Sequence, residues 1–226
     1  MIVCHQHKFI FLKPKKTGGT SVELALSNLC APDDIITPVH EEHLRSGQGP
    51  GNYIVPYRDW LWRLGLRSGG GSSPKFVFSA HSLGRDIRRH LGRKLWDRYR
   101  KVSIIRNPWD REVSRFFWVR GRPNIPAEFE EFVERVTQRH PILNDGLRWG
   151  LNRDGNGFLM RYENLADDYA AFVRSLGVTE VPELPHAKGE TRPGQARRYR
   201  EVYTDKSREA VMSIYRGEIK AFGYEF

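Results

Sequence analysis

The sequence predicts one α/β domain built on a short central parallel sheet that is flanked by helices. Short apolar segments alternate along the chain with amphipathic helical segments, which is the pattern of parallel strands joined by helices. The length of 226 residues suits one domain with a sizeable core, and 39% of the residues are hydrophobic. No internal repeat divides the chain, so we expect residues 1–226 to form a single domain.

Four apolar segments have the length and composition of buried strands. They are Lys8 to Lys13, Lys75 to Ala80, Lys101 to Ile105 and Gly157 to Glu163. Apolar residues at helical spacing follow each of them, and Gly92, Gly177 and Thr204 are suited to helix ends. The segments 31–74 and 182–203 are rich in proline, glycine and charge, so they are predicted as long loops, a common place for function.

The composition indicates an anionic partner. The formal net charge is +10, which fits a nucleic acid, a nucleotide, an acidic glycan or a membrane surface. Cys4 and Cys30 form neither a disulfide framework nor a metal-ligand spacing, and we expect buried free thiols. No signal-peptide pattern and no apolar segment of membrane-spanning length are present, which favours a cytoplasmic location without a transmembrane segment.

The stretch "FIFLKPKKTGGTSVELAL" joins a predicted strand to a predicted helix through two glycines. Gly18 and Gly19 permit a tight turn, and the amides of Thr20 and Ser21 can face an anion at the helix N-terminus. Lys16 adds a positive charge beside them. A P-loop of the kinase and GTPase type is disfavoured, because that motif requires Gly-Lys followed by Ser or Thr and the chain contains no Gly-Lys pair.

A second motif, "SIIRNPWDREVSRFFW", begins at the end of another predicted strand. Arg106 ends the strand, Pro108 suits the first turn of a helix, and Ser114 lies in that helix. Ligands of open α/β sheets bind at the carboxyl ends of the strands, so Arg106 and Ser114 could hold a second phosphate there. We expect Asp110 and Arg111 to form an ion pair or to occupy the first helical turn.

Together the two motifs resemble the sulfotransferases that use 3′-phosphoadenosine 5′-phosphosulfate (PAPS). "KKTGGTS" is similar to the 5′-phosphosulfate loop of that family, and "RNPWDREVS" is similar to its 3′-phosphate motif. "RYENLADDYAAFVRSLGV" and "YRGEIKAFGYEF" resemble the carbohydrate sulfotransferase branch, so the likeness excludes only about residues 31–74, a predicted acceptor-side insertion. The resemblance implies that the cofactor is bound by Lys16, Thr17, Gly18, Gly19, Thr20, Ser21, Arg106 and Ser114.

One departure concerns the residues before the glycine turn. Family members often carry His-hydrophobic-Pro-Lys there, whereas this chain has Lys13, Pro14, Lys15 and Lys16. The catalytic role of the family lysine therefore falls on Lys16, and the roles of Lys13 and Lys15 stay open.

The resemblance implies transfer of the sulfuryl group of PAPS to a hydroxyl, with PAP as product and no metal. The expected acceptor is a carbohydrate or glycolipid, and a small-molecule hydroxyl is also open. The reaction calls for cations that stabilise charge on the leaving phosphate and for a general base. His81, directly after a predicted strand, is the expected base, and its rivals are His40, Glu41, Glu42 and His43.

The basic loop "HAKGETRPGQARRYR" precedes the last predicted helix. In relatives such a loop covers the cofactor or the acceptor, which implies binding roles for Lys188, Arg192, Arg197 and Arg198. Two other functions are compatible with the charge. A nucleic-acid-binding protein would explain +10, but no helix-turn-helix, zinc-finger or RRM signature is present. A nucleotide-dependent kinase is the third hypothesis for the function.

Overall fold

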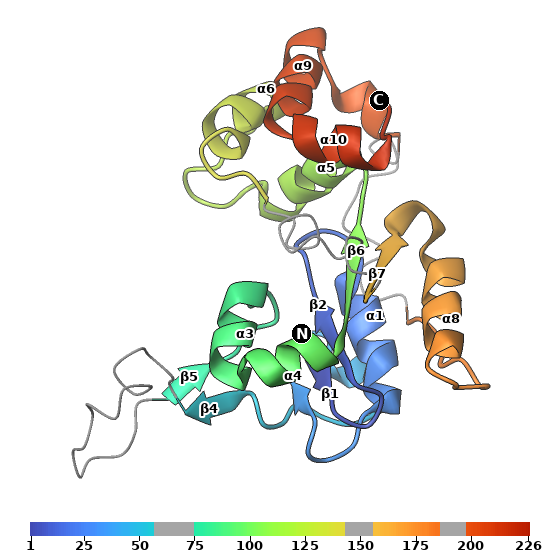
Figure 1. The fold of residues 1–226 in the computed structure, drawn as a ribbon. Helices are drawn as coiled ribbons and strands as arrows, with labels where there is room; N and C mark the ends of the chain where they lie inside the picture. The colour runs from blue at the N-terminus through green and yellow to red at the C-terminus, as the bar shows by residue number, and fades with distance from the viewer. Residues whose placement is uncertain (57–74, 143–155, 186–197) are drawn as a thin grey trace.

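The computed structural model describes residues 1–56, 75–142, 156–185 and 198–226, and its elements form a sheet with helices on both faces and a further helical layer beyond one end of the sheet (Figure 1). The central sheet has five strands in the order β3-β1-β2-β6-β7. Their bounds are Ile35–Ile36 for β3, Ile2–Cys4 for β1, Phe9–Leu12 for β2, Arg100–Ile105 for β6 and Gly157–Arg161 for β7.

The pairing of the strands confirms the predicted fold class. β2 pairs parallel with β6, and β6 pairs parallel with β7. β1 and β3 extend the sheet on the other side of β2 with antiparallel pairing, so the sheet is mixed. These two short strands were not predicted, because three apolar residues at Ile2–Cys4 and two at Ile35–Ile36 are too few to give a periodic signal.

Side chains of the central strands alternate between two apolar cores. In β2, Phe9 and Phe11 pack on one face with α1 (Gly19–Leu26) and α8 (Leu165–Ser175). Ile10 and Leu12 pack on the other face with α3 (Gly84–Leu91) and α4 (Arg93–Arg98). Burial on both faces explains why β2 reads as an unbroken apolar run.

A third core lies in the helical layer that follows β6 (Figure 1). Its elements are α5 (Pro108–Val119), α6 (Phe129–Phe132), the π-helical turn η3 (Val133–Thr137), α9 (Asp205–Ile214) and α10 (Arg216–Phe222). Asn107 caps α5 and accepts a hydrogen bond from the amide of Trp109, with Pro108 in the first turn as predicted. Thr204 caps α9, as predicted, and forms a capping box with Ser207.

The strand predicted at Lys75 to Ala80 lies outside the central sheet. It forms β5 (Lys75–Val77), which pairs antiparallel with β4 (Ile54–Pro56) in a separate two-stranded sheet. Only one face of this pair is covered, since Phe76 is half-buried while Val77 is exposed. His81 therefore follows a peripheral strand, and its place at the site depends on the turn after that strand. No helix in the described ranges is both long enough and apolar enough to cross a membrane.

Of the two arrangements expected of Asp110 and Arg111, the structure has the second, because both lie in the first turn of α5 and do not pair with each other. Successive helical side chains point in different directions, so each finds a partner elsewhere. Asp110 pairs with Arg106. Arg111 is fully buried and donates two hydrogen bonds to Glu218 of α10, with Nη1–Oε1 and Nη2–Oε2 distances of 2.7 and 2.9 Å.

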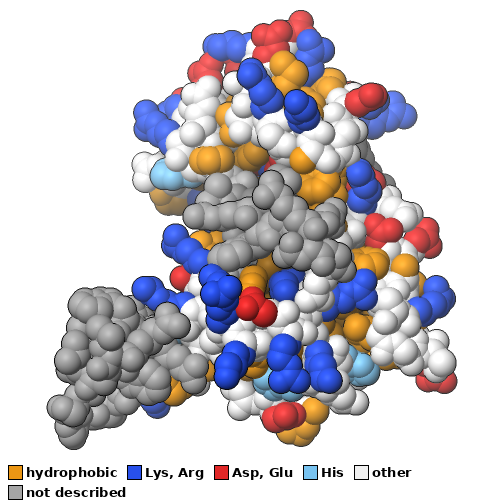
Figure 2. All heavy atoms as spheres, viewed as in Figure 1, with side chains coloured by type: hydrophobic (Ala, Val, Ile, Leu, Met, Phe, Trp, Pro, Cys, Tyr) orange, Lys and Arg blue, Asp and Glu red, His pale blue; other side chains and the backbone are white. Residues whose placement is uncertain are grey.

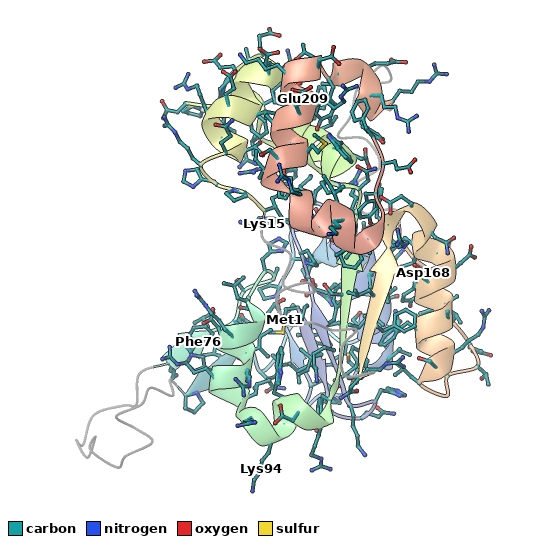
Figure 3. All side chains as sticks on the ribbon, turned by 45° about the horizontal axis from the view of Figure 1, so that its top comes forward. Met1, Lys15, Phe76, Lys94, Asp168 and Glu209 are labelled. Carbon is teal, nitrogen blue, oxygen red and sulfur yellow. The ribbon has the colours of Figure 1, made fainter. Side chains whose placement is uncertain are left out.

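The Arg111–Glu218 pair should be essential to the helical layer. We expect Glu218→Ala to lower the free energy of unfolding by about 3–5 kcal/mol, because it leaves a buried guanidinium without its counter-charge. Glu209→Ala is the matched control, since Glu209 is exposed on the outer side of α9 (Figure 3) and should change stability by less than about 0.5 kcal/mol. Urea unfolding of both variants measures the difference, and equal losses would contradict the assignment.

Candidate active site

A cleft of about 850 Å³ lies at the carboxyl ends of the parallel strands. Leu12 at the end of β2, Arg106 after β6 and Tyr162 after β7 all line it, as do the N-terminus of α1 and one face of α5. Open α/β sheets bind their ligands at this edge. Lys15, another lining residue, lies where the helical layer meets the sheet (Figure 3).

The lining of the cleft is strongly cationic. Six lysines and arginines line it, and no carboxylate does among the residues that the structure describes. The six are Lys13, Lys15, Lys16, Arg106, Arg115 and Arg122. Lys and Arg side chains also appear on both sides of the grey segment in the middle of the molecule (Figure 2). The charge of this lining favours an anionic ligand.

The turn between β2 and α1 depends on both glycines. Gly18 has φ = 76°, a left-handed conformation that side chains with a Cβ resist, and it precedes the first residue of α1. A Cβ on Gly19 would lie 2.8 Å from Cγ of Lys13. The glycines thus allow the amide end of α1 to face the cleft, with Thr20 and Ser21 also in the lining.

Lys13 forms a buried ion pair that holds the loop after β2 against α1. Its side chain is buried, and its ammonium lies 2.7 Å from Oε2 of the buried Glu23 in α1. Oε1 of Glu23 accepts hydrogen bonds from the Met1 ammonium at 2.5 Å and from Thr37 at 2.9 Å. Lys13 therefore ties the loop to α1, while Lys15 is exposed in the cleft.

The backbone and the side chain of Lys16 both contact residues of the second motif. Its backbone adopts a left-handed conformation with φ = 62°, which is uncommon for a residue with a side chain. Its carbonyl accepts a hydrogen bond of 2.8 Å from Nη1 of Arg106. Its ammonium lies 4.6 Å from the centre of the Trp118 indole, a cation–π contact. The two motifs are thus joined directly.

Arg106 is almost fully buried and is fixed on three sides. Asp110 accepts hydrogen bonds from its guanidinium, with an Nε–Oδ2 distance of 2.7 Å, and the Lys16 carbonyl takes another. The Tyr162 ring stacks on the guanidinium at 3.7 Å. Arg106 lines the cleft together with Ser114, two turns along α5, so the structure brings together both residues of the predicted 3′-phosphate motif.

His81 lines the same cleft. Its Nδ1 lies 2.9 Å from the carbonyl oxygen of Lys13, which can only accept, so Nδ1 carries the hydrogen and Nε2 of the neutral ring carries the lone pair. Desolvation by the cleft wall, reinforced by the charges of Lys13 and Lys15, lowers the pKa of His81 from 6.5 to about 4. The imidazole is therefore neutral at pH 7 and has a basic nitrogen available.

The four other candidate bases lie outside the cleft. None of His40, Glu41, Glu42 and His43 lines the cleft. Glu42 accepts hydrogen bonds from Arg45 and from the amide of Val39, and these outweigh its partial burial and lower its pKa. The structure describes residues 31–56 of the predicted acceptor-side insertion, and none of them lines the cleft. The rest of the insertion, residues 57–74, lies outside the described residues.

Several other predicted residues fall away from the cleft or outside the described ranges. The Thr17 side chain is buried, and its hydroxyl donates to the Pro14 carbonyl at 3.1 Å. Arg198 is largely exposed and pairs with Glu201. Lys188, Arg192 and Arg197 lie outside the residues that the structure describes.

One group of potential metal ligands occurs in the described part of the chain, outside the residues that line the cleft. Ligand atoms of Cys4, Cys30 and Asp34 lie within 4.8 Å of one another. Both carboxylate oxygens of Asp34 accept backbone hydrogen bonds, from His5 and Ala31. Contact with the Cys4 thiol and burial raise the pKa of the Cys30 thiol, which opposes the thiolate that a metal needs.

The sequence-based prediction missed several polar and aromatic lining residues, among them Arg115, Trp118, Arg122, His140 and Tyr162. Trp118 follows Ser114 by four residues and lies on the same face of α5, so helical spacing could have identified it. Tyr162 could not be found this way, because its role depends on the pairing of β7 with β6.

Comparison with known proteins identifies the class. A family model described as "Sulfotransferase family" matches residues 1–225, and the chain therefore belongs to the sulfotransferase family. An uncharacterized protein of Archaeoglobus fulgidus is 34% identical over 100 residues, which are 42% of this chain and 81% of that protein. The structure is also similar to mouse sulfotransferase SULT7A1 complexed with PAP, with a TM-score of 0.55 and 13% identity over 96% of this chain and 86% of the mouse chain, which supports the fold.

The left-handed backbone at Lys16 gives a stability prediction. The free energy of unfolding of Lys16→Gly should exceed that of Lys16→Ala by about 1 kcal/mol, because glycine adopts a positive φ without the penalty of a Cβ. Urea unfolding of the two variants measures this difference. Both variants lose the same ammonium, so the comparison isolates the backbone. A Lys16→Ala variant as stable as Lys16→Gly would contradict a strained backbone here.

The environment of His81 gives a titration prediction. NMR of the labelled imidazoles should give His81 a pKa of about 4, and saturating PAP should raise it because a nearby anion favours the imidazolium. His43, outside the cleft, should show no PAP-dependent shift of its resonances. A His81 pKa near the usual value of 6.5, unaffected by PAP, would mean that the ring does not face the anion site.

Proposed function

We propose that this protein transfers the sulfuryl group of PAPS to a hydroxyl of a carbohydrate or glycoconjugate. The observation that carries the proposal is the direct link between two anion-binding motifs in one cleft, where Arg106 donates to the Lys16 carbonyl. A nucleotide with phosphates at both its 3′ and 5′ ends needs two such sites at fixed separation. Membership of the sulfotransferase family supports the same reaction.

The residues present fit this cofactor. The N-terminus of α1, from Gly18 to Ser21, offers backbone amides to the 5′-phosphosulfate. Arg106 and Ser114 would hold the 3′-phosphate through charge-assisted hydrogen bonds. PAPS supplies the activated sulfuryl group when it is bound. Lys188, Arg192 and Arg197 are proposed to cover it, as the basic loop does in relatives.

Lys16 is proposed as the catalytic cation. During transfer the bond between sulfur and the bridging phosphate oxygen breaks, and negative charge grows on that oxygen. A preorganised ammonium stabilises this charge in the transition state more than in the ground state. Lys16 is suited to the role because its backbone accepts a hydrogen bond from Arg106 and the residue lines the cleft beside Trp118.

His81 is proposed as the general base. The acceptor hydroxyl loses a proton as its oxygen bonds to sulfur, and Nε2 of His81 can take that proton because Nδ1 is occupied by the Lys13 carbonyl. The low pKa keeps this nitrogen unprotonated across the neutral range. The growing anionic charge in the cleft raises the basicity of the ring as the reaction needs it.

The function is tested by transfer of labelled sulfate from PAPS across glycan, glycolipid and phenolic acceptors. With an accepted substrate, Lys16→Ala should lower turnover by roughly 10²–10³ while PAP binding changes little. Lys94→Ala is the control, because Lys94 is exposed at the far end of the sheet from Lys15 (Figure 3), and it should retain full turnover. Near-normal turnover of Lys16→Ala would refute the catalytic role.

A further inference from the structure

The segment "RYENL" begins at Arg161, the last residue of β7, and the proposed function assigns no role to its glutamate. β7 is the parallel neighbour of β6, the strand that leads to Arg106, and the backbone pairing ends where Ile105 lies opposite Arg161. Both chains then leave the sheet at the edge that borders the cleft, which Arg106 and Tyr162 both line. The residues directly after these two strands therefore meet at the proposed 3′-phosphate site.

Side chains continue the register of β6 and β7 beyond the last backbone pair. One step further, Arg106 is opposite Tyr162, and the guanidinium lies 3.7 Å from the centre of the ring. Two steps further, Asn107 is opposite Glu163, and the Asn107 amide donates to Oε1 of Glu163 at 2.7 Å. The carboxylate thus takes the place that a backbone carbonyl of β7 would have if the parallel ladder continued.

The carboxylate of Glu163 satisfies a buried amide at the start of α5. Asn107 is 9% exposed and is the N-cap of the helix, so its amide needs an acceptor from elsewhere. A hydrogen bond from an amide to a carboxylate is stronger than one between neutral groups. The Tyr224 hydroxyl donates to Oε2 of Glu163 at 3.4 Å, and Nδ2 of Asn107 donates to the Glu225 carbonyl at 2.8 Å. Residues 224–225 therefore contact the same carboxylate and the same asparagine.

From these contacts we infer that Glu163 is a positioning residue for the 3′-phosphate. By holding the amide of Asn107 it fixes the backbone from which the Arg106 side chain projects into the cleft. Glu163 itself does not line the cleft, so it acts through Asn107 and Arg106 and does not touch the ligand. The inference rests on the proposed function. A displaced guanidinium would lose part of its geometry toward the phosphate, since binding groups depend on the residues that support them.

The positioning role is tested by calorimetric titration of Glu163 variants with PAP and with 5′-AMP. The two nucleotides differ only in the 3′-phosphate, so the ratio of their affinities reports on Arg106. Glu163→Ala should lower this ratio by about three- to tenfold through weaker PAP binding, the range for one impaired charge-assisted contact, while 5′-AMP binding changes by less than about twofold. Glu163→Gln keeps an acceptor oxygen for the Asn107 amide and should restore the wild-type ratio.

Asp168→Ala is the matched control. Oδ2 of Asp168 accepts a hydrogen bond of 2.6 Å from the amide of Arg161, so it is also a carboxylate that holds a backbone amide at the end of β7. Its acceptor contacts are to Arg161 and Asn164, and neither residue belongs to the 3′-phosphate motif. Asp168→Ala should therefore keep the affinity ratio. Urea unfolding of both variants separates a loss of stability from a loss of positioning.

An unchanged affinity ratio in Glu163→Ala, an equal loss for both nucleotides, or a loss that Glu163→Gln does not restore would overturn the positioning role. Those results, with tighter binding of PAP than of 5′-AMP by the wild type, would leave the proposed function standing. Equal affinities in the wild type would overturn the 3′-phosphate site and the positioning role with it. Failure of the wild type to bind PAP would overturn the proposed function itself.

Discussion

The hydrogen bond from Arg106 to the carbonyl of Lys16 is the contact on which the geometry of the cleft depends. It joins the loop after β2 to the loop after β6, which are 90 residues apart in the chain. Parallel pairing brings these loops together, with Leu12 opposite Ser103 and the buried Ser103 hydroxyl donating to the Leu12 carbonyl at 2.9 Å. The sheet thus sets the separation of the two proposed anion sites, and Arg106 holds the backbone of the lysine between them.

A dense group of cations is sustained without carboxylates in the described lining because the counter-charges lie behind it. Glu23 neutralises Lys13 from within α1, and Asp110 holds Arg106 from the first turn of α5. Buried arginine and lysine need such partners, since an unpaired buried charge is costly. The strained backbone of Lys16 fits the same picture, because unusual dihedral angles concentrate at functional sites and require support from their surroundings.

Much of this arrangement could be predicted from the sequence where the signal is local. The glycine turn, the cap of α9 and Pro108 at the start of α5 follow from short-range chemistry, and the structure has all three. Two ion pairs were missed although their partners are near in the sequence: Lys13 pairs with Glu23, ten residues later, and Asp110 pairs with Arg106 at i,i+4 spacing instead of with its neighbour Arg111. What depends on long-range pairing could not be predicted. The strand at Lys75–Val77 joined β4 outside the central sheet, yet the turn after it still brings His81 to the Lys13 carbonyl.

In the proposed function, the cleft holds one nucleotide through two phosphate sites at once. Calorimetric titration with PAP and with 5′-AMP tests it most directly, because the two ligands differ only in the 3′-phosphate. Contacts of Arg106 and Ser114 with that phosphate predict that PAP binds about tenfold more tightly or better, a difference that charge-assisted hydrogen bonds can supply. Equal affinities of PAP and 5′-AMP would mean that Arg106 and Ser114 do not bind a 3′-phosphate.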